Sequence, residues 1–246
     1  MPQLEKYHRP ESVESALELL GRSGVRTALV AGGTYLTPRL DEDVEEVVDL
    51  QAVGLDQIEH DDERMTVGAM VTIQAIVDDE EAPELLREMA RREGPNTFRN
   101  QGTVGGAIAR ADSENEFLAA LLVFEADVTV QTADGERQMA LDDFLEDAKD
   151  ARENGIVTAV SLAKEGKTAD ARVARTPADT PIVAAVGRRD GAGNVRLALC
   201  GVAERPIVVD PEEIEDVDPP ADFRGSAEYR RQMAGVLGRR VVAALI

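Results

Sequence analysis

The sequence is poor in the residues that carry many common kinds of catalysis. Its 246 residues include one cysteine, Cys200, and two histidines, His8 and His60. A single cysteine excludes an intrachain disulfide, a cysteine-ligated iron–sulfur cluster and a zinc knuckle, and two histidines exclude a three-histidine zinc site. Nothing near either histidine suggests a Ser/His/Asp triad. We therefore expect no metal site formed by this chain alone.

Aromatic residues and long apolar runs are also scarce. Aromatics make up 3% of the chain and there is no Trp, so extended stacking surfaces for bases or sugars are not expected. No stretch approaches 18 apolar residues, and the first ten residues, MPQLEKYHRP, contain no apolar signal region. These absences predict a cytoplasmic protein without membrane insertion.

Positively charged residues are few, and lysine is especially rare. The chain has 27 Lys and Arg residues against 48 Asp and Glu, a net charge of −21, and only four of the cations are lysines. A surface this negative repels nucleic acid and anionic lipid, which makes both poor candidates as partners. Abundant acidic residues with few lysines are typical of proteins from salt-loving organisms, where salt screens the self-repulsion. We expect a halophilic origin.

What is present is the pattern of a mixed α and β protein with a sizeable core, since 43% of the residues are hydrophobic. The apolar spacing predicts a capped helix that begins at Thr72 and helices over 11–21, 84–93, 114–124 and 227–245. Ser12 is the expected N-cap and Gly21 the expected C-cap of the helix over 11–21. Apolar runs and alternation predict strands over 28–31, 46–50, 64–69, 127–132, 138–140, 182–188 and 195–200. Asp134-Gly135 predicts that the strands over 127–132 and 138–140 form a hairpin. A boundary near residues 161–170 separates two expected subdomains from a smaller C-terminal domain.

Two diglycines mark the candidate binding loops. Gly32-Gly33 follows a buried strand, and Gly105-Gly106 lies between Thr103 and an apolar stretch that leads to a helix. Glycine lets the backbone approach a ligand closely, and consecutive amides can cradle an anion, while Thr34 and Thr103 add hydroxyl donors. Phosphate binding and plain turns both remain open for such loops. The sequence contains neither the G-x-G-x-x-G fingerprint nor a P-loop, which argues against a Rossmann domain and a P-loop nucleotidase.

Ordered sequence blocks over nearly the whole chain carry a resemblance to a known family. The blocks are AGGTYLTPRL (31–40), MTVGAMVTIQAI (65–76), FRNQGTVGGAIARADSENEFLAALLVFEADV (98–128), VARTPADTPIVAAV (173–186), CGVAERPIVV (200–209) and DFRGSAEYRRQMAGVLGRRVVAAL (222–245). With these blocks the chain resembles the FAD-binding medium subunit of the molybdenum hydroxylases, a group that includes xanthine dehydrogenase and aerobic-type carbon monoxide dehydrogenase. One diglycine is weak evidence, whereas six ordered blocks are specific.

The resemblance implies an α+β fold of the type called PCMH-like. An FAD-binding region over residues 1–165, made of two α/β subdomains of about 1–55 and 56–165, would precede a C-terminal domain over 166–246 with an antiparallel sheet and a terminal helix. The implied role is that of an oxidoreductase subunit. It would take electrons from the [2Fe–2S] clusters of a small partner subunit and pass them to an external acceptor. A large molybdopterin-containing subunit would oxidise the substrate, in a dimer of heterotrimers.

The resemblance also assigns cofactor-binding residues. The first FAD loop corresponds to Ala31, Gly32, Gly33, Thr34 and Tyr35, and the second to Thr103, Val104, Gly105, Gly106 and Ala107. Both loops approach the FAD pyrophosphate in the family. Glu116 matches a position that faces the ribose of the adenosine half, and Arg172 matches a basic position near the flavin. The redox chemistry would belong to the flavin, so no catalytic side chain is implied.

Departures from the family pattern keep rival interpretations open. The second loop usually reads TIGGN, so Ala107 removes a side-chain amide and with it one hydrogen bond to the cofactor. Tyr35 replaces an Asp or a small residue, and the stretch between Val209 and Asp222 is shorter than usual. These changes motivate the alternative of a flavin-less structural subunit that docks the other subunits. A free-standing flavin oxidase or reductase of related fold is a third possibility.

The arginines of the terminal helix have two interpretations as well. Arg230, Arg231, Arg239 and Arg240 stand out in an acidic chain. They could cap the helix and form ion pairs within the chain, or they could dock an acidic partner subunit.

Overall fold

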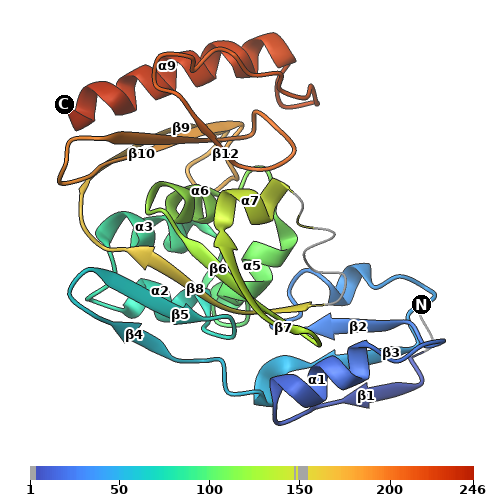
Figure 1. The fold of residues 1–246 in the computed structure, drawn as a ribbon. Helices are drawn as coiled ribbons and strands as arrows, with labels where there is room; N and C mark the ends of the chain where they lie inside the picture. Colours follow the sequence, from blue (N-terminus) through green and yellow to red (C-terminus); the bar gives the residue numbers. More distant parts are fainter. Residues whose placement is uncertain (1–3, 147, 149–154) are drawn as a thin grey trace.

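The computed structural model describes residues 4–146, 148 and 155–246, and within these residues the strands form three sheets (Figure 1). The smallest sheet is parallel, with the order β1-β3-β2 (β1 Lys6–His8, β2 Thr27–Val30, β3 Glu46–Asp49). Helix α1 (Val13–Leu20) packs on it, with Ser12 as N-cap and Gly21 as C-cap, as predicted. Two 3₁₀ turns, η1 (Thr37–Arg39) and η2 (Leu50–Ala52), follow β2 and β3.

The middle sheet is antiparallel and has the order β4-β5-β8-β6-β7. Its strands are β4 (Ile58–His60), β5 (Arg64–Gly68), β6 (Asp127–Thr132), β7 (Gly135–Ala140) and β8 (Gly155–Ala163). Strands β6 and β7 form the hairpin that the Asp134-Gly135 pair predicts. The central strand β8 contacts β5 and β6, which lie far from it and from each other in the sequence.

Six helices of the described chain accompany the middle sheet. They are α2 (Ile73–Asp78), α3 (Glu84–Arg92), α4 (Asn96–Arg99), α5 (Val104–Arg110), α6 (Glu116–Val123) and α7 (Leu141–Glu146). Every residue of α6 is buried. The reason is that α6 lies between the C-terminal sheet and helices α3 and α7, so that both of its faces are covered (Figure 1). It therefore joins the two parts of the molecule through one core.

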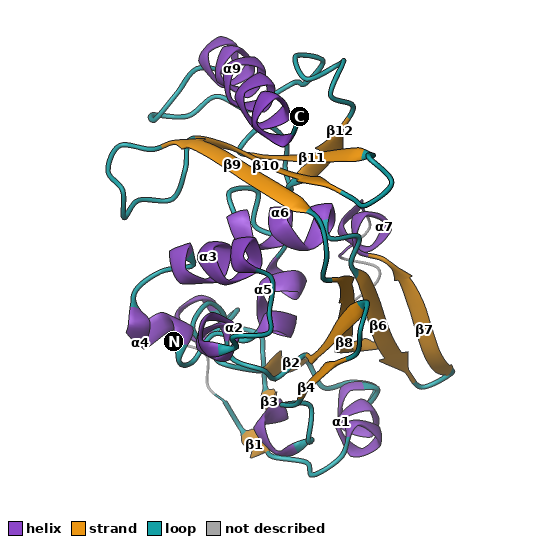
Figure 2. Ribbon diagram, turned by 90° about the vertical axis from the view of Figure 1, so that its left-hand side faces the viewer, coloured by secondary structure: helices purple, strands orange, loops and turns teal. Residues whose placement is uncertain are grey.

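The C-terminal sheet is antiparallel, with the order β12-β11-β10-β9 (β9 Lys167–Val173, β10 Val183–Arg189, β11 Val195–Cys200, β12 Ile207–Val209). Helix α9 (Ala227–Leu245) covers one face and α6 the other, which the turned view shows as stacked layers (Figure 2). The predicted boundary at residue 165 falls in the short loop between β8 and β9, strands of different sheets. The mixed α and β architecture with a C-terminal antiparallel sheet confirms the expected fold class.

The structure places three of the four terminal-helix arginines in contacts within the chain. Arg230 is buried and donates to the carbonyl oxygens of Ile182 (2.7 Å) and Gly201 (2.9 Å). Arg231 pairs with Asp218, and Arg239 pairs with Glu215. These contacts favour the capping and ion-pair interpretation, because the guanidinium groups are already engaged.

No helix among the described residues is both long and apolar enough to cross a lipid bilayer. No cluster of three or more His, Cys, Asp or Glu side chains in the same residues has the arrangement of a metal site. Cys200 is fully buried, and burial raises the pKa of its thiol well above the ordinary range, as expected of an inert core residue.

Candidate functional site

The first diglycine begins the loop that follows β2. Gly32 lies against the segment that precedes the second diglycine, so that a Cβ at Gly32 would overlap the carbonyl oxygen of Gln101. Gly33 has a φ of +68°, a left-handed conformation that glycine adopts without strain. The two glycines therefore do different things: Gly32 permits contact between the two loops, and Gly33 turns the chain toward Thr34 and Tyr35.

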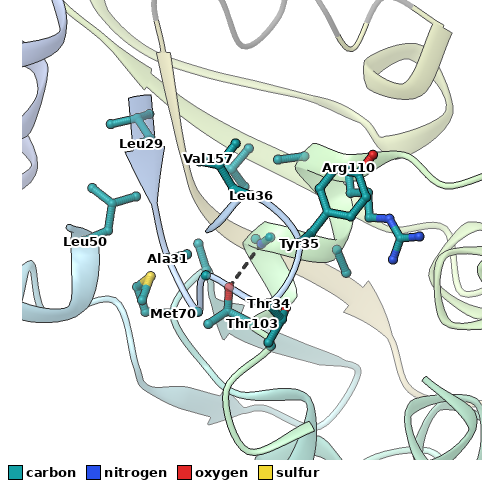
Figure 3. Close-up of a pocket in the computed structure, with 18 of the residues that line it drawn as sticks. Leu29, Ala31, Thr34, Tyr35, Leu36, Leu50, Met70, Thr103, Arg110 and Val157 are labelled. Atoms are coloured by element: carbon teal, nitrogen blue, oxygen red, sulfur yellow. Dashed lines mark hydrogen bonds between the residues drawn. The ribbon is translucent and has the colours of Figure 1, made fainter. Parts of the chain in front are cut away.

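The second diglycine lies in the first turn of α5 and not in an open loop. Thr103 is the N-cap, and its hydroxyl accepts a hydrogen bond from Gly106 N (3.1 Å; Figure 3). Val104 N donates to the Val71 oxygen (2.9 Å) and Gly105 N to the Ala69 oxygen (2.8 Å). The contacts of this turn fix it against the end of β5.

Gly105 and Gly106 also differ in their surroundings. A Cβ at Gly105 would lie 2.7 Å from the Cβ of Ala69, so glycine is needed there for packing. A Cβ at Gly106 would meet only the Thr103 hydroxyl, at 3.0 Å, and is otherwise unobstructed. Of the two, Gly106 is the glycine that leaves room for a ligand.

The backbone donors of the two loops are not equivalent. Each N–H from Val104 to Ala107 already has an acceptor within the protein. By contrast, the N–H groups of Gly32, Gly33, Thr34 and Tyr35 have no acceptor among the residues that the structure describes. Successive free N–H groups around a left-handed residue are the geometry of an anion-binding nest. The first loop can therefore supply backbone donors to an anion. The second loop forms part of the cavity wall and supplies the Thr103 hydroxyl.

Both loops line one large cavity of about 1160 Å³ (Figure 3). Its apolar part comes from β2, the start of η2, the segment just after β5 and the start of β8, with Leu29, Leu50, Met70, Ile156 and Val157 among the lining residues. The cavity thus lies between the N-terminal sheet and the middle sheet. It combines an apolar wall with the two glycine turns, a combination typical of sites that bind a ligand with an apolar ring and an anionic group.

The charged residues at the cavity are mostly cations. Arg39, Arg99 and Arg110 line it, and among the described residues the only acidic one that does so is Glu93. The chain has a net charge of −21, yet positively charged side chains outnumber negatively charged ones at the cavity. The Arg99 guanidinium already forms hydrogen bonds within the protein, to Gln74 Oε1 (2.9 Å) and to the Arg91 carbonyl oxygen (3.0 Å).

Glu93 is half-buried and accepts a hydrogen bond from Asn115 Nδ2 (2.9 Å). Burial raises the pKa of Glu93 to about 7, against the opposing charge of Arg110 and with the support of the negative charges of Asp112 and Glu116. The cavity therefore contains a carboxyl group that changes charge near neutral pH.

The structure brings most of the sequence-predicted site residues together and leaves three away from the cavity surface. Ala31, Gly32, Gly33, Thr34, Tyr35, Thr103, Gly105, Gly106 and Ala107 line the cavity. Val104, Glu116 and Arg172 do not. Val104 is a buried core residue whose side chain packs away from the cavity lining.

Glu116, which is buried, and Arg172, which is partly buried, belong to a charge cluster beside the cavity. A Glu116 carboxylate oxygen lies 3.1 Å from Arg92 Nη1, and the other lies 3.5 Å from Arg172 Nε. Arg92 also pairs with Asp170 of β9 (2.7 Å). Burial raises the pKa of Glu116 although both arginines oppose the shift. The cluster ties α3 and α6 to the C-terminal sheet.

Sequence reasoning missed Arg39, Arg99, Arg110 and Glu93. One signal was available for Arg110: it follows Gly106 by four residues, which places both on the same face of a helix. That signal depends on recognising α5 as a helix.

Comparisons with known proteins agree with this geometry. Residues 3–164 match the family described as "FAD binding domain in molybdopterin dehydrogenase". The uncharacterized protein YgfM of Escherichia coli K12 is 31% identical over 252 residues, covering 95% of this chain and 93% of that protein. The carbon monoxide dehydrogenase medium chain of Afipia carboxidovorans is 30% identical over 272 residues, covering 96% and 94%.

A solved structure shows the same fold. The chain is similar to a chain of the carbon monoxide dehydrogenase from Hydrogenophaga pseudoflava that lacks the Mo-pyranopterin moiety of the molybdenum cofactor. The TM-score is 0.88 with 25% sequence identity, and the match covers 100% of this chain and 98% of that chain.

Proposed function

Since the chain belongs to the family of FAD-binding domains of molybdopterin dehydrogenases, we propose that it is the electron-transfer subunit of a molybdenum hydroxylase. The observation that carries this proposal is the cavity between the two glycine turns. It has free backbone donors on one side, an apolar wall on another, and three arginines in an otherwise acidic chain.

The residues at the cavity fit FAD, the cofactor of the family. A volume of about 1160 Å³ accommodates a ligand larger than a mononucleotide, and Gly106 leaves the backbone of α5 open to it. The N–H groups of residues 32–35 and the Thr103 hydroxyl would hold the pyrophosphate. When bound, the flavin supplies the redox chemistry, while the protein binds, orients and shields it.

Two family-derived assignments stay proposals. Glu116 would face the ribose of the adenosine half, and Arg172 would lie near the flavin. Both residues lie close to the cavity. Asn115, the residue before Glu116, lines the cavity and contacts Glu93, and Arg172 lies beside Glu116. Glu116 pairs with both Arg92 and Arg172, and these contacts also give Glu116 and Arg172 a structural role.

The proposed partners follow from the relatives. Relatives named as medium chains imply larger assemblies, and one is a subunit of the 6-hydroxypseudooxynicotine dehydrogenase complex. We infer a small subunit with two [2Fe–2S] clusters that donates electrons and a large subunit that carries the molybdenum cofactor. The three would assemble as a dimer of heterotrimers of the carbon monoxide dehydrogenase or xanthine dehydrogenase type, with reoxidation by an external acceptor.

Purification of the tagged full chain from its source cells tests this proposal. The expected complex contains two further subunits, and chemical analysis finds flavin, iron and molybdenum in it. A complex with iron and molybdenum but no flavin would instead support the flavin-less structural subunit that Ala107 motivates. A chain that carries flavin but purifies without iron or molybdenum would support a free-standing flavoprotein and contradict the proposal.

A further inference from the structure

Tyr35 of the first loop holds two arginines at the cavity. The guanidinium carbon of Arg39 lies 4.4 Å from the centroid of the Tyr35 ring, and that of Arg110 lies 4.5 Å from it. Both distances are well within the range of cation–π contacts. Figure 3 shows Tyr35 beside Arg110 at the cavity lining. The ring therefore gathers two positive charges from two different parts of the chain.

The two arginines approach from opposite subdomains. Arg39 ends η1 in the N-terminal part, and its guanidinium also donates to the Tyr35 carbonyl oxygen (3.2 Å). Arg110 ends α5, one helical turn beyond Gly106, and pairs with Asp112. Arg39 has no carboxylate partner among the residues that the structure describes. Together they form a pair of exposed cations next to the free N–H groups of the first loop.

We propose that Arg39 and Arg110 bind the diphosphate of FAD and that Tyr35 is the positioning residue that holds both guanidinium groups at the cavity. This proposal rests on the proposed FAD binding. The diphosphate carries the negative charges of FAD, so it is the part of the ligand that two guanidinium groups recognise, and the planar donors of arginine match phosphate oxygens. A guanidinium stacks on a ring through its face and donates hydrogen bonds through the N–H groups at its edge, so both arginines keep the contact with Tyr35 while they bind the phosphates.

Arg39 and Arg110 offset the repulsion between this acidic chain and an anionic ligand. With a net charge of −21 the protein as a whole repels a dianionic ligand. The N–H groups of the first loop carry only partial charges, whereas Arg39 adds a full positive charge and Arg110 adds one that is partly balanced by Asp112. Arg99 is less available, because its donors are engaged with Gln74 and with backbone carbonyl oxygens.

Titration of the purified full chain with FAD, followed by flavin fluorescence, tests the two arginines. We expect Arg39→Gln and Arg110→Gln each to weaken FAD binding by about 10- to 100-fold and to make it less dependent on salt. Riboflavin, which lacks the diphosphate, should bind the variants as it binds the wild type. The control is Arg240→Gln, an exposed arginine on α9, which should leave FAD binding unchanged.

The positioning role of Tyr35 is tested by a pair of variants. Tyr35→Phe keeps the ring and should bind FAD like the wild type, whereas Tyr35→Leu should bind FAD about tenfold more weakly at low salt, with an unchanged melting temperature. Wild-type binding in both arginine variants would overturn the diphosphate assignment while leaving the proposed function intact. Equal loss in Tyr35→Phe and Tyr35→Leu would overturn the role of the ring. A wild type that binds neither FAD nor riboflavin would instead overturn the proposed function, and this inference with it.

Discussion

The backbone of Gly32 lies directly against the carbonyl group of Gln101, with no room for a side chain between them. This contact joins the loop after β2 to the segment that leads into α5, so the two diglycines are fixed relative to each other without a ligand. Contacts within the chain therefore set the spacing of the two turns that line the cavity.

Gly105 and Gly106 should respond differently to substitution by alanine. Gly105→Ala places a Cβ 2.7 Å from that of Ala69 and should lower the free energy of unfolding by about 1–3 kcal/mol. Gly106→Ala meets only the Thr103 hydroxyl and should change stability by less than about 1 kcal/mol, while the added methyl group weakens FAD binding. Urea unfolding and FAD titration of both variants measure the two effects. Equal stability losses would contradict the different roles assigned to the two glycines.

Restoring the family's amide at position 107 should tighten cofactor binding. Ala107 lines the cavity next to Gly106, so the side chain of an Ala107→Asn variant can reach a bound ligand. One hydrogen bond contributes about 0.5–1.5 kcal/mol, which corresponds to about a 2- to 10-fold lower Kd for FAD. Fluorescence titration measures the change, with Ala109→Asn, a second cavity-lining position on α5, as the matched control. An Ala107→Asn variant that folds normally and binds FAD no better than the control would argue against this hydrogen bond.

Glu93 should make stability depend on pH in an identifiable range. Burial raises its pKa from 4.5 in the unfolded chain to about 7, so the folded state holds the proton more tightly. Its contribution is therefore fully present below about pH 4.5 and is lost as the pH rises through about 7, by at most about 3 kcal/mol. Glu93→Gln, which is always neutral, should remove this loss.

The measurement is urea unfolding of wild type and Glu93→Gln at several pH values between about 4.5 and 8. The variant should gain stability relative to the wild type as the pH rises. Glu84→Gln, at an exposed position of α3, the helix whose C-cap is Glu93, is the matched control and should show a constant difference. A constant difference for Glu93→Gln as well would show that Glu93 titrates normally.

The charge composition predicts a strong effect of salt, and we propose a halophilic origin on that ground. Self-repulsion at a net charge of −21 is screened as the Debye length shortens. The melting temperature should therefore rise steadily between about 0.1 M and about 2 M KCl. Thermal unfolding followed by circular dichroism measures it. A melting temperature that stays flat or falls over this range would remove the physical basis for that origin.

Much of the fold could be predicted because local signals agreed with the tertiary structure. Ser12 and Thr72 cap the helices that their positions predicted, and the Asp134-Gly135 pair forms the predicted hairpin. In these places a side-chain oxygen or a turn residue determines the local conformation, so no distant contact is needed.

Two of the elements that were missed, β8 and α5, depend on distant contacts. Strands β8 and β9 flank a turn rich in Lys and Gly that looked like a boundary, and β8 pairs with β5 about a hundred residues earlier. Helix α5 contains a diglycine that disfavours helix, yet hydrogen bonds to Val71 and Ala69 hold its first turn in place. Arg39 and Arg110 were missed for the same reason, since their convergence on Tyr35 requires both loops to be placed.

The central claim is that this chain binds FAD in the cavity between its two glycine turns. The most direct test is an absorption spectrum of the purified full chain, incubated with FAD and then passed through gel filtration. The account predicts flavin absorbance that elutes with the protein at about one FAD per chain, and much less for the Gly106→Ala variant. A wild-type chain that is folded by circular dichroism but elutes colourless would contradict it.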